Sequence, residues 1–578
     1  MGAFLRRALF FGFVAGLVVL HLALVGLIVK LDERNLINGL VTIGTVIPIL
    51  VALVAGFLAA RPMRRGELVI PTPMTGLLSG AVAGLTGGLM VAAFTWLADA
   101  YSIRDVLINA SPKLVQILHW GMDATTGTLA LIVGGAAMGL LGAVIRILPG
   151  TLRRGAITGL SAVVGLALMQ TFVVQILTGL SLDFISTFFY ARDGMTEPGA
   201  VVALVACVVG GWAWAERGHA VRTRYTTMTP TQRRNIRWSF IGIAILILLS
   251  LPMFVGSFLA TALDTVGIYV LLGLGLNIVV GFAGLLDLGY VAFYAVGAYA
   301  TAVLTSGASP AFAPQLNFWL AVPLVMLVAA LIGLTIGAPV LRLRGDYLAI
   351  VTLAFGEIAR IIFLSDWMTP YLGGAQGILQ VPAPNFFGID LRQPEKLYYP
   401  ILVACIIAAV AAISLANSRV GRAWTAMRED ESVAEATGIN TTKYKLLAFS
   451  LGATFGGLAG ALYAVRIGSV FPQELNIIVS INALALIILG GIGSIPGVIV
   501  GSVVLVGLPE LLREFSEYRL LVYGIVLVAM MLLRPEGLLP NRSRRAELHE
   551  GEDDSKPDWD EQDWEKEAGA ETPTPMIT

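Results

Sequence analysis

The sequence predicts an all-α polytopic integral membrane protein with about 16 transmembrane helices in two bundles. Of its 578 residues, 57% are hydrophobic and 13% are charged, whereas a soluble globular protein carries about 25% charged residues. Long windows without any charge recur, and each can cross a hydrocarbon core about 30 Å thick as a helix. They are too long and too evenly apolar for barrel strands. These windows are 8–29, 38–60, 68–98, 238–263, 265–286, 288–306 and 318–341.

Arginine and lysine in short loops predict the orientation of the first bundle. With Arg6 and Arg7 in the cytoplasm, the basic segments 61–65, 146–154 and 217–237 also fall inside. The intervening loops fall outside and carry less net positive charge. These outer loops are 30–34, 104–113 and 183–197. One assignment therefore satisfies every loop and gives six helices in residues 1–216.

The same charge rule gives the helices of the second bundle and places both termini in the cytoplasm. Its helices are predicted near 238–258, 264–283, 288–306, 318–341, 346–364, 398–416, 444–465, 478–493, 497–512 and 519–534. A long loop, 365–397, falls outside, and a charged segment, 417–443, falls inside. The two short spans within 478–512 flank a glycine-rich turn, which is typical of tilted, broken or re-entrant helices.

Composition divides the chain into four parts. Residues 1–216 form a six-helix membrane bundle without an identifiable role, and 217–237 form a basic cytoplasmic linker. The second bundle occupies 238–540. In the tail, 541–578, twelve acidic residues stand between positions 547 and 571 against Lys556 and Lys566. Such a segment cannot bury enough apolar surface to fold, so we expect a disordered cytoplasmic tail; a docking tail is the alternative.

Several kinds of chemistry are missing from the sequence. A phosphate-binding loop needs lysine directly after glycine, and none of the seven lysines follows a glycine. The two cysteines, Cys207 and Cys405, lie in apolar windows without a CxxC pattern, so neither a disulfide nor a metal site is expected. We therefore expect no enzyme activity, cofactor or metal in this chain.

Charged residues are sparse in the predicted spans of the second bundle. The exceptions are Asp287, between two spans, and Glu357 with Arg360, which can pair at i, i+3 on one helix face. Ion-coupled carriers commonly place carboxylates inside the membrane. The sparsity therefore argues against an ion relay and favours an external source of energy. Glu357 and Arg360 can serve as a structural pair or as part of a transport pathway.

Three stretches of the second bundle resemble the LivM-type permease subunit of branched-chain amino acid ABC importers. They are 269–299, 341–360 with 373–377, and 421–438 continuing to 460. With the segment 490–496, the resemblance spans residues 240–540. The first bundle resembles no family that its residues identify.

The resemblance implies a permease without covalent chemistry of its own in the bacterial cytoplasmic membrane. Its expected partners are the lipid bilayer, a second permease subunit, two cytoplasmic ATPase subunits and an extracytoplasmic binding protein that delivers Leu, Ile or Val. No nucleic acid is implied. Import of urea or short amides is the nearest alternative, because related permeases share these motifs. An ion-coupled secondary carrier and a membrane enzyme or scaffold are alternatives from other classes.

The segment 419–438 is predicted as a charged amphipathic helix that ends at Gly438, a common helix stop. In the resembled family, the matching segment is the coupling helix, which sits in a groove of the ATPase. A solvated loop helix is the alternative. The expected polar rim consists of Arg428, Glu429, Asp430, Glu431 and Glu435, and the expected buried anchors are Trp424, Met427 and Val433.

Polar side chains within the apolar helices are candidates for the substrate path. Interhelical hydrogen bonding is the competing role for each of them. These candidates are Asn277, Asp287, Tyr290, Tyr294, Tyr299 and Glu357.

Overall fold

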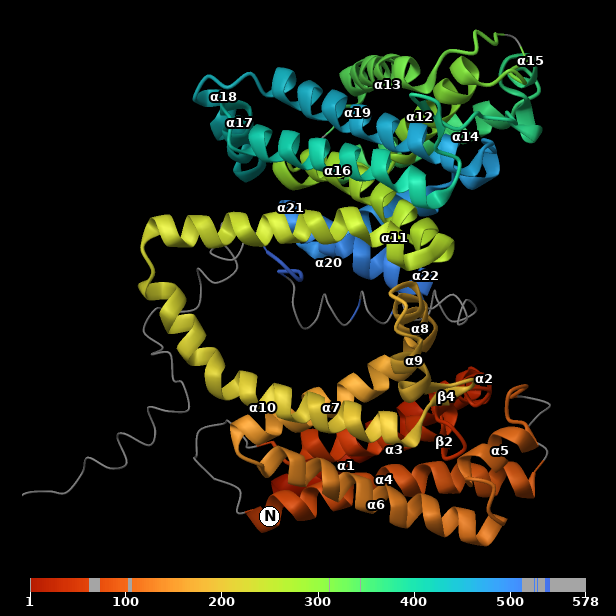
Figure 1. Cartoon of the computed structure of the whole chain (residues 1–578), viewed down its shortest axis with the longest axis vertical. Helices are drawn as coiled ribbons and strands as arrows, with labels where there is room; N and C mark the ends of the chain where they lie inside the picture. The colour runs from red at the N-terminus through yellow and green to blue at the C-terminus, as the bar shows by residue number, and fades with distance from the viewer. Residues whose placement is uncertain are drawn as a thin grey trace, which may run out of the picture. The chain divides into compact units, whose positions relative to one another are not determined.

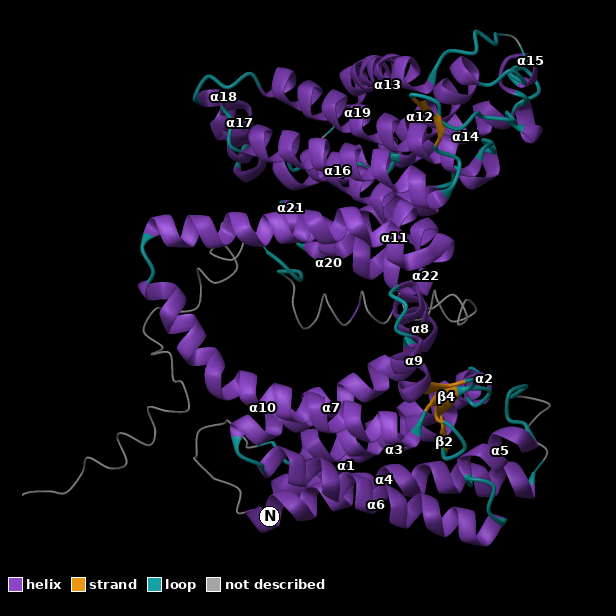
Figure 2. Cartoon of the chain, viewed as in Figure 1, coloured by secondary structure: helices purple, strands orange, loops and turns teal. Residues whose placement is uncertain are grey.

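The computed structural model describes residues 2–61, 73–101, 107–310, 312–341, 343, 345–511, 524, 528 and 536–540. The chain divides into two compact units, Met1–Gly256 and Ser257–Thr578. Helix dominates both (Figure 2), as the apolar windows predict. The acidic tail and most of the predicted span 519–534 lie outside the described residues.

The predicted linker 217–237 falls on two helices. The end of α10 (Glu197–Thr227) and the start of α11 (Pro230–Leu276) occupy it. Helix α11 is interrupted at Gly256, where φ is +72°, a conformation that favours glycine because it has no Cβ. The two units meet in the sequence at this residue.

The described part of the first unit contains nine helices before α10 and four short strands, and Figure 1 shows their arrangement. The helices are α1 (Gly2–Leu24), α2 (Leu27–Leu31), α3 (Ile43–Ala59), α4 (Pro73–Ala100), α5 (Pro112–Leu118), α6 (Ala124–Ile147), α7 (Gly150–Leu168), α8 (Gln170–Gly179) and α9 (Asp183–Phe189). The strands are β1 (Asn35–Ile37), β2 (Val41–Thr42), β3 (Tyr190–Ala191) and β4 (Gly194–Met195), in the order β2-β1-β4-β3. The sequence did not predict this small sheet, because each strand is only two or three residues long.

Glycines hold the helices of the first unit close together. A Cβ atom added to Gly84 of α4 would lie 2.0 Å from the carbonyl oxygen of Gly135 on α6. One added to Gly56 of α3 would lie 1.9 Å from the carbonyl oxygen of Gly139. Small residues are the usual means of packing helices where lipid weakens the hydrophobic driving force.

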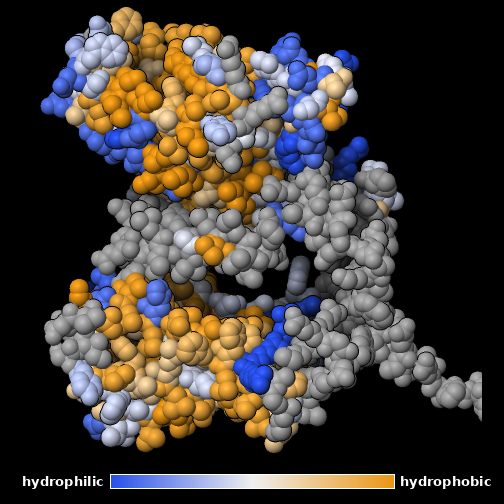
Figure 3. All heavy atoms as spheres, turned by 180° about the vertical axis from the view of Figure 1, so that it is seen from behind, coloured by the Kyte–Doolittle hydropathy of each residue, from blue (hydrophilic) through white to orange (hydrophobic). Residues whose placement is uncertain are grey.

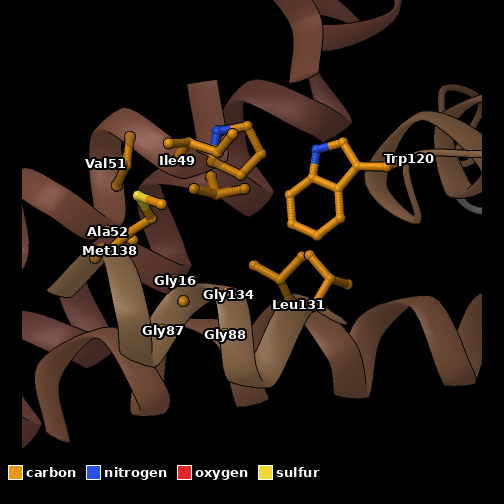
Figure 4. A pocket seen from close by; sticks show the side chains of 15 residues that line it. Gly16, Ile49, Val51, Ala52, Gly87, Gly88, Trp120, Leu131, Gly134 and Met138 are labelled. Carbon is orange, nitrogen blue, oxygen red and sulfur yellow. The ribbon is translucent and has the colours of Figure 1, made fainter. Parts of the chain in front are cut away.

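An apolar cavity of about 110 Å³ lies among α1, α3, α4 and α6. Figure 4 shows Trp120, which follows α5, on one side of this cavity, with Leu131 and several glycines nearby. Its lining residues carry no acidic or basic side chain, so the cavity suits an apolar group and offers no acid–base chemistry.

The second unit contains the rest of α11 and the elements that follow it (Figure 1). They are η2 (Asn277–Phe282), α12 (Val291–Thr305), α13 (Phe318–Val340), α14 (Asp346–Leu364), α15 (Thr369–Leu372), η3 (Gly374–Gln376), β5 (Asn385–Phe386), β6 (Ile389–Asp390), α16 (Pro394–Ala416), α17 (Arg419–Glu429), α18 (Glu431–Ala436), α19 (Thr441–Ile467), η4 (Pro472–Glu474), α20 (Ile477–Gly490), α21 (Ile495–Ser502), η5 (Val503–Gly507) and α22 (Leu508–Leu511). Two of these, η2 and η5, are π-helices, which are rare and are often found at functional sites.

Among the described residues, ten helices are long and apolar enough to cross a membrane, or eleven if the bent pair α7–α8 forms one span. The predicted count of 16 is therefore not confirmed. Four predicted spans correspond to shorter apolar helices of 10–17 residues: Ile43–Ala59, Ile245–Phe254, Val291–Thr305 and Ile495–Gly507. Hydrophobic side chains cover much of the described surface (Figure 3), as expected for helices that face lipid.

Segments predicted to lie on the same side of the membrane contact one another within each unit. In the first unit, Ile37, three residues after the predicted outer loop 30–34, pairs with Met195 in the predicted outer loop 183–197. In the second unit, Ile378 pairs with Val470 on the predicted outer side. On the predicted inner side, the Leu538 amide donates to the Leu489 carbonyl. These contacts fit the predicted alternation of loops.

Candidate functional site

The segment 419–438 forms two helices instead of the single predicted helix. Asp430 breaks the helix because its backbone is extended, with φ −154° and ψ 112°. Its carboxylate accepts hydrogen bonds from the amides of Ser432 and Val433, at 2.8 and 3.0 Å, and so caps α18. Gly438 follows α18 with φ +91°, as expected for a glycine helix stop.

The apolar face of α17 points into its own unit. Trp424 is fully buried, and its indole nitrogen donates to the Tyr444 carbonyl at 2.8 Å. Met427 is buried as well. The prediction that these two side chains anchor the segment in a partner's groove is therefore wrong, because they already fill the core of this chain. Val433 remains 58% exposed and is available to a partner.

Arg428 extends from α17 to a junction of three backbone segments. Its guanidinium donates to the carbonyl oxygen of Gly281, in η2, at 3.0 Å. The backbone of Gly284, with φ +72°, packs against the Arg428 stem: a Cβ atom at Gly284 would lie 2.6 Å from Arg428 Cγ. A Cβ atom at Gly493 would lie 3.7 Å from the same guanidinium. Glycine at these positions lets one arginine contact two loops at once.

The remaining rim residues divide into an inward and an outward set. Glu431 accepts a hydrogen bond of 2.6 Å from the Lys445 ammonium group, whose side chain is only 7% exposed. Glu429 and Glu435 are exposed, although Glu429 lies 3.6 Å from Arg428. The outward face of α17 and α18, here called the outer face, therefore consists of Glu429, Asp430, Val433 and Glu435.

Asn277 and Asp287 are almost completely buried near this junction. The Asn277 side-chain oxygen accepts a hydrogen bond from the Gly493 amide at 2.9 Å, which joins η2 to the loop before α21. The Asp287 carboxylate, between η2 and α12, accepts from the Gly289 amide at 2.9 Å. Burial raises the pKa of Asp287 to about 7, and the Gly289 hydrogen bond partly opposes that shift.

The three candidate tyrosines are buried between helices. Tyr290 donates from its hydroxyl to the Gly452 carbonyl on α19 at 2.7 Å. The Tyr294 ring lies 5.2 Å from that of Tyr463 on α19, and the Tyr299 ring stacks 4.6 Å from Phe363 on α14. All three contacts join α12, or Tyr290 directly before it, to a neighbouring helix, which is the role that competes with a place on the substrate path.

Glu357 is on α14. Its carboxylate accepts a hydrogen bond of 2.9 Å from Arg360 Nε, as the i, i+3 spacing predicts. The side chains of Glu357 and Arg360 remain 38% and 29% exposed. By contrast, α16 exposes aliphatic side chains that suit lipid: Val403, Ile407 and Val410.

Sequence reasoning missed Lys445, Gly281 and Gly493 as members of the site. Lys445 begins a predicted span, and nothing in its spacing from Glu431 marks them as a pair. The glycine-rich turn 491–497 did signal a break in the helices, but its partner across the fold is 216 residues away.

Comparison with known proteins assigns the second unit to a family. Residues 258–533 match the family described as branched-chain amino acid transport system / permease component. The permease protein LivM of the high-affinity branched-chain amino acid transport system of Escherichia coli K12 is 42% identical over 307 residues, which cover 49% of this chain and 70% of LivM. LivM of Salmonella typhimurium LT2 is 42% identical over 308 residues, which cover 49% of this chain and 71% of LivM.

More distant relatives include LivH, a permease protein of the same E. coli system. It is 27% identical over 293 residues, which cover 47% of this chain and 91% of LivH. No solved structure matches this chain. The extent of the LivM similarity shows that this multi-pass membrane protein belongs to the branched-chain amino acid transport system permease family.

Proposed function

We propose that the chain is the permease subunit of an ATP-driven importer for leucine, isoleucine and valine in the bacterial cytoplasmic membrane. The 42% identity to two LivM permeases carries this proposal. The similarity to LivH supports a second, homologous permease as partner. Two cytoplasmic ATPases and an extracytoplasmic binding protein complete the importer, and ATP is hydrolysed on the ATPase subunits.

The outer face of α17 and α18 supports the ATPase assignment. It presents acidic side chains around Val433, while Trp424 and Met427 fix the segment to the core of the second unit. A partner that binds this face can push on the helices without dislodging them. The Arg428 contact with η2 gives such a movement a direct route into the membrane helices.

The partly exposed ion pair on α14 supports the proposal that this helix contacts a polar neighbour and not only lipid. A charged pair that remains partly exposed on a membrane-spanning helix is costly against lipid tails. We place Glu357 and Arg360 against the second permease or along the substrate path between the two permeases. Among the candidate path residues, Glu357 keeps the most accessible charge.

An uptake assay tests the proposed function. We expect proteoliposomes that contain the full importer to take up radiolabelled leucine only when ATP and the binding protein are both supplied. Excess isoleucine or valine should compete, and urea should not. Leucine uptake that follows a sodium gradient without any ATPase subunit would instead identify an ion-coupled carrier.

Single cysteines test the predicted orientation of the second unit. Glu429→Cys should react with a membrane-impermeant maleimide only from the cytoplasmic side, and Phe387→Cys only from the outside, because these exposed positions lie in loops of opposite predicted side. Cys207 and Cys405 are replaced by serine in both variants. If position 429 reacts in intact cells, the orientation is the reverse of the predicted one.

A further inference from the structure

An open pocket lies at the end of the second unit away from α17 and α18, and its volume is about 450 Å³. Its walls come from the loop between α12 and α13 and from the segment before β5. Helix α12 starts next to Asp287, near the Arg428 junction, and ends at Thr305 in the pocket wall. Figure 1 likewise places α17 and α18 beside one end of α16 and α19, and α15 beside the other end. The pocket therefore opens on the predicted extracytoplasmic side.

Side-chain amides dominate the polar lining of this pocket. Gln315, Asn317, Gln380 and Asn385 line it, together with no acidic or basic residue. Gln315 and Gln380 adopt positive φ angles of +50° and +57°. Residues other than glycine rarely take this conformation, and it persists where the surrounding structure imposes it. Two such glutamines in one pocket indicate a wall that is held in a fixed shape.

Exposed aromatic rings form the rim beside Asn385. The hairpin β5–β6 carries Phe386 and Phe387, and Phe387 is 94% exposed. The Phe386 ring lies 5.7 Å from Trp319 and 4.8 Å from Phe387, both edge to face. Trp319 also donates from its indole nitrogen to the Asn385 carbonyl at 2.8 Å, which ties the hairpin to α13. The aromatic rim is thus built into the pocket wall.

We infer that this pocket and its rim are the docking site for a surface loop of the extracytoplasmic binding protein, which rests on the function proposed above. Lipid tails offer no hydrogen bonds to amides, so a lipid occupant would leave the pocket wall unsatisfied. Exposed aromatics surrounded by adaptable polar groups are characteristic of protein–protein interfaces.

Two variants in the complete importer test this inference. Phe387→Ala removes the most exposed ring, and Gln380→Gly removes an amide while keeping a residue that accepts the positive φ. ATP hydrolysis is measured in nanodiscs against increasing leucine-loaded binding protein. We expect the half-saturating concentration to rise about tenfold or more for Phe387→Ala and about threefold for Gln380→Gly, with unchanged maximal rate.

Trp367→Ala is the matched control, because Trp367 is 70% exposed after α14 and does not line the pocket. It should leave the half-saturating concentration unchanged. If Phe387→Ala also stays within about twofold of the wild-type value, the docking site is wrong. If ATP hydrolysis by the wild-type importer does not respond to the binding protein, the proposed function is wrong.

Cross-linking separates a protein partner from the membrane surface. Phe387→Cys, labelled with benzophenone maleimide and irradiated with the loaded binding protein, should give a covalent adduct with that protein. Adducts with lipid alone would show that the hairpin contacts the bilayer, and they would overturn the inference.

Discussion

Replacing Arg428 with alanine is expected to reduce ATP-driven leucine uptake by about tenfold or more while the ATPase subunits stay bound. The side chain donates to the Gly281 carbonyl in η2 and packs under Gly284. A hydrogen bond from a charged group contributes about 1.5–3 kcal/mol, and its loss removes the direct contact between α17 and η2. The readout is uptake per ATP hydrolysed in proteoliposomes, together with co-purification of the ATPases.

The contrasting variant is Glu435→Ala on the outer face, which touches neither η2 nor the core. It should weaken ATPase co-purification, whereas Arg428→Ala should preserve it. Arg428→Lys keeps the charge and loses the planar donor geometry, so we expect partial uptake. If Arg428→Ala and Glu435→Ala lose the ATPases equally, Arg428 acts at the partner surface and the inward contact has no part in coupling.

Gly460→Ala is expected to destabilise the second unit markedly. A Cβ atom at this position in α19 would lie 2.0 Å from the Tyr294 carbonyl oxygen of α12 and 2.8 Å from the Ala298 amide. Both obstacles are backbone, so the two helices must move apart. Overpacking of a core costs about 1–3 kcal/mol and occasionally more. Thermal unfolding of the detergent-solubilised chain should show a clear loss of stability.

Gly337→Ala in α13 provides the comparison, because its added Cβ would meet side chains at 3.3 Å and beyond. Those side chains, chiefly Leu446, can adjust, and the melting temperature should change little. Equal melting temperatures for the two variants would show that α12 and α19 pack less closely than described.

The membrane helices were the most predictable part of this fold. The charge-free window 318–341 gave the limits of α13 to within a residue, because charge is excluded from the hydrocarbon region. The predicted span 346–364 coincides with α14, although that helix carries Glu357 and Arg360. The break at Asp430 was not predicted, since the helical pattern on either side of it continues without interruption. An aspartate that caps a new helix and an aspartate on a helix surface look alike until the backbone is known.

The sequence also could not predict the direction in which the apolar face of α17 points. An amphipathic pattern shows that Trp424 and Met427 are covered, and it does not show by which chain. In this protein the cover is the chain's own core, including the Tyr444 carbonyl. The path candidates present the same ambiguity, because a tyrosine that joins two helices and a tyrosine that faces a solute have identical sequence signals.

In the proposed importer, opposite faces of α17 and α18 bind the ATPase and transmit its movement to the membrane helices. In this importer, Glu429, Val433 and Glu435 of the outer face can vary to suit one ATPase or another, because none of them forms the core contacts made by Trp424 and Met427. The hydrogen bond from Arg428 to η2 ends on a backbone carbonyl, that of Gly281, so this bond does not require a matching side chain on η2. A permease built in this way can exchange its motor subunit during evolution while retaining the same transmission.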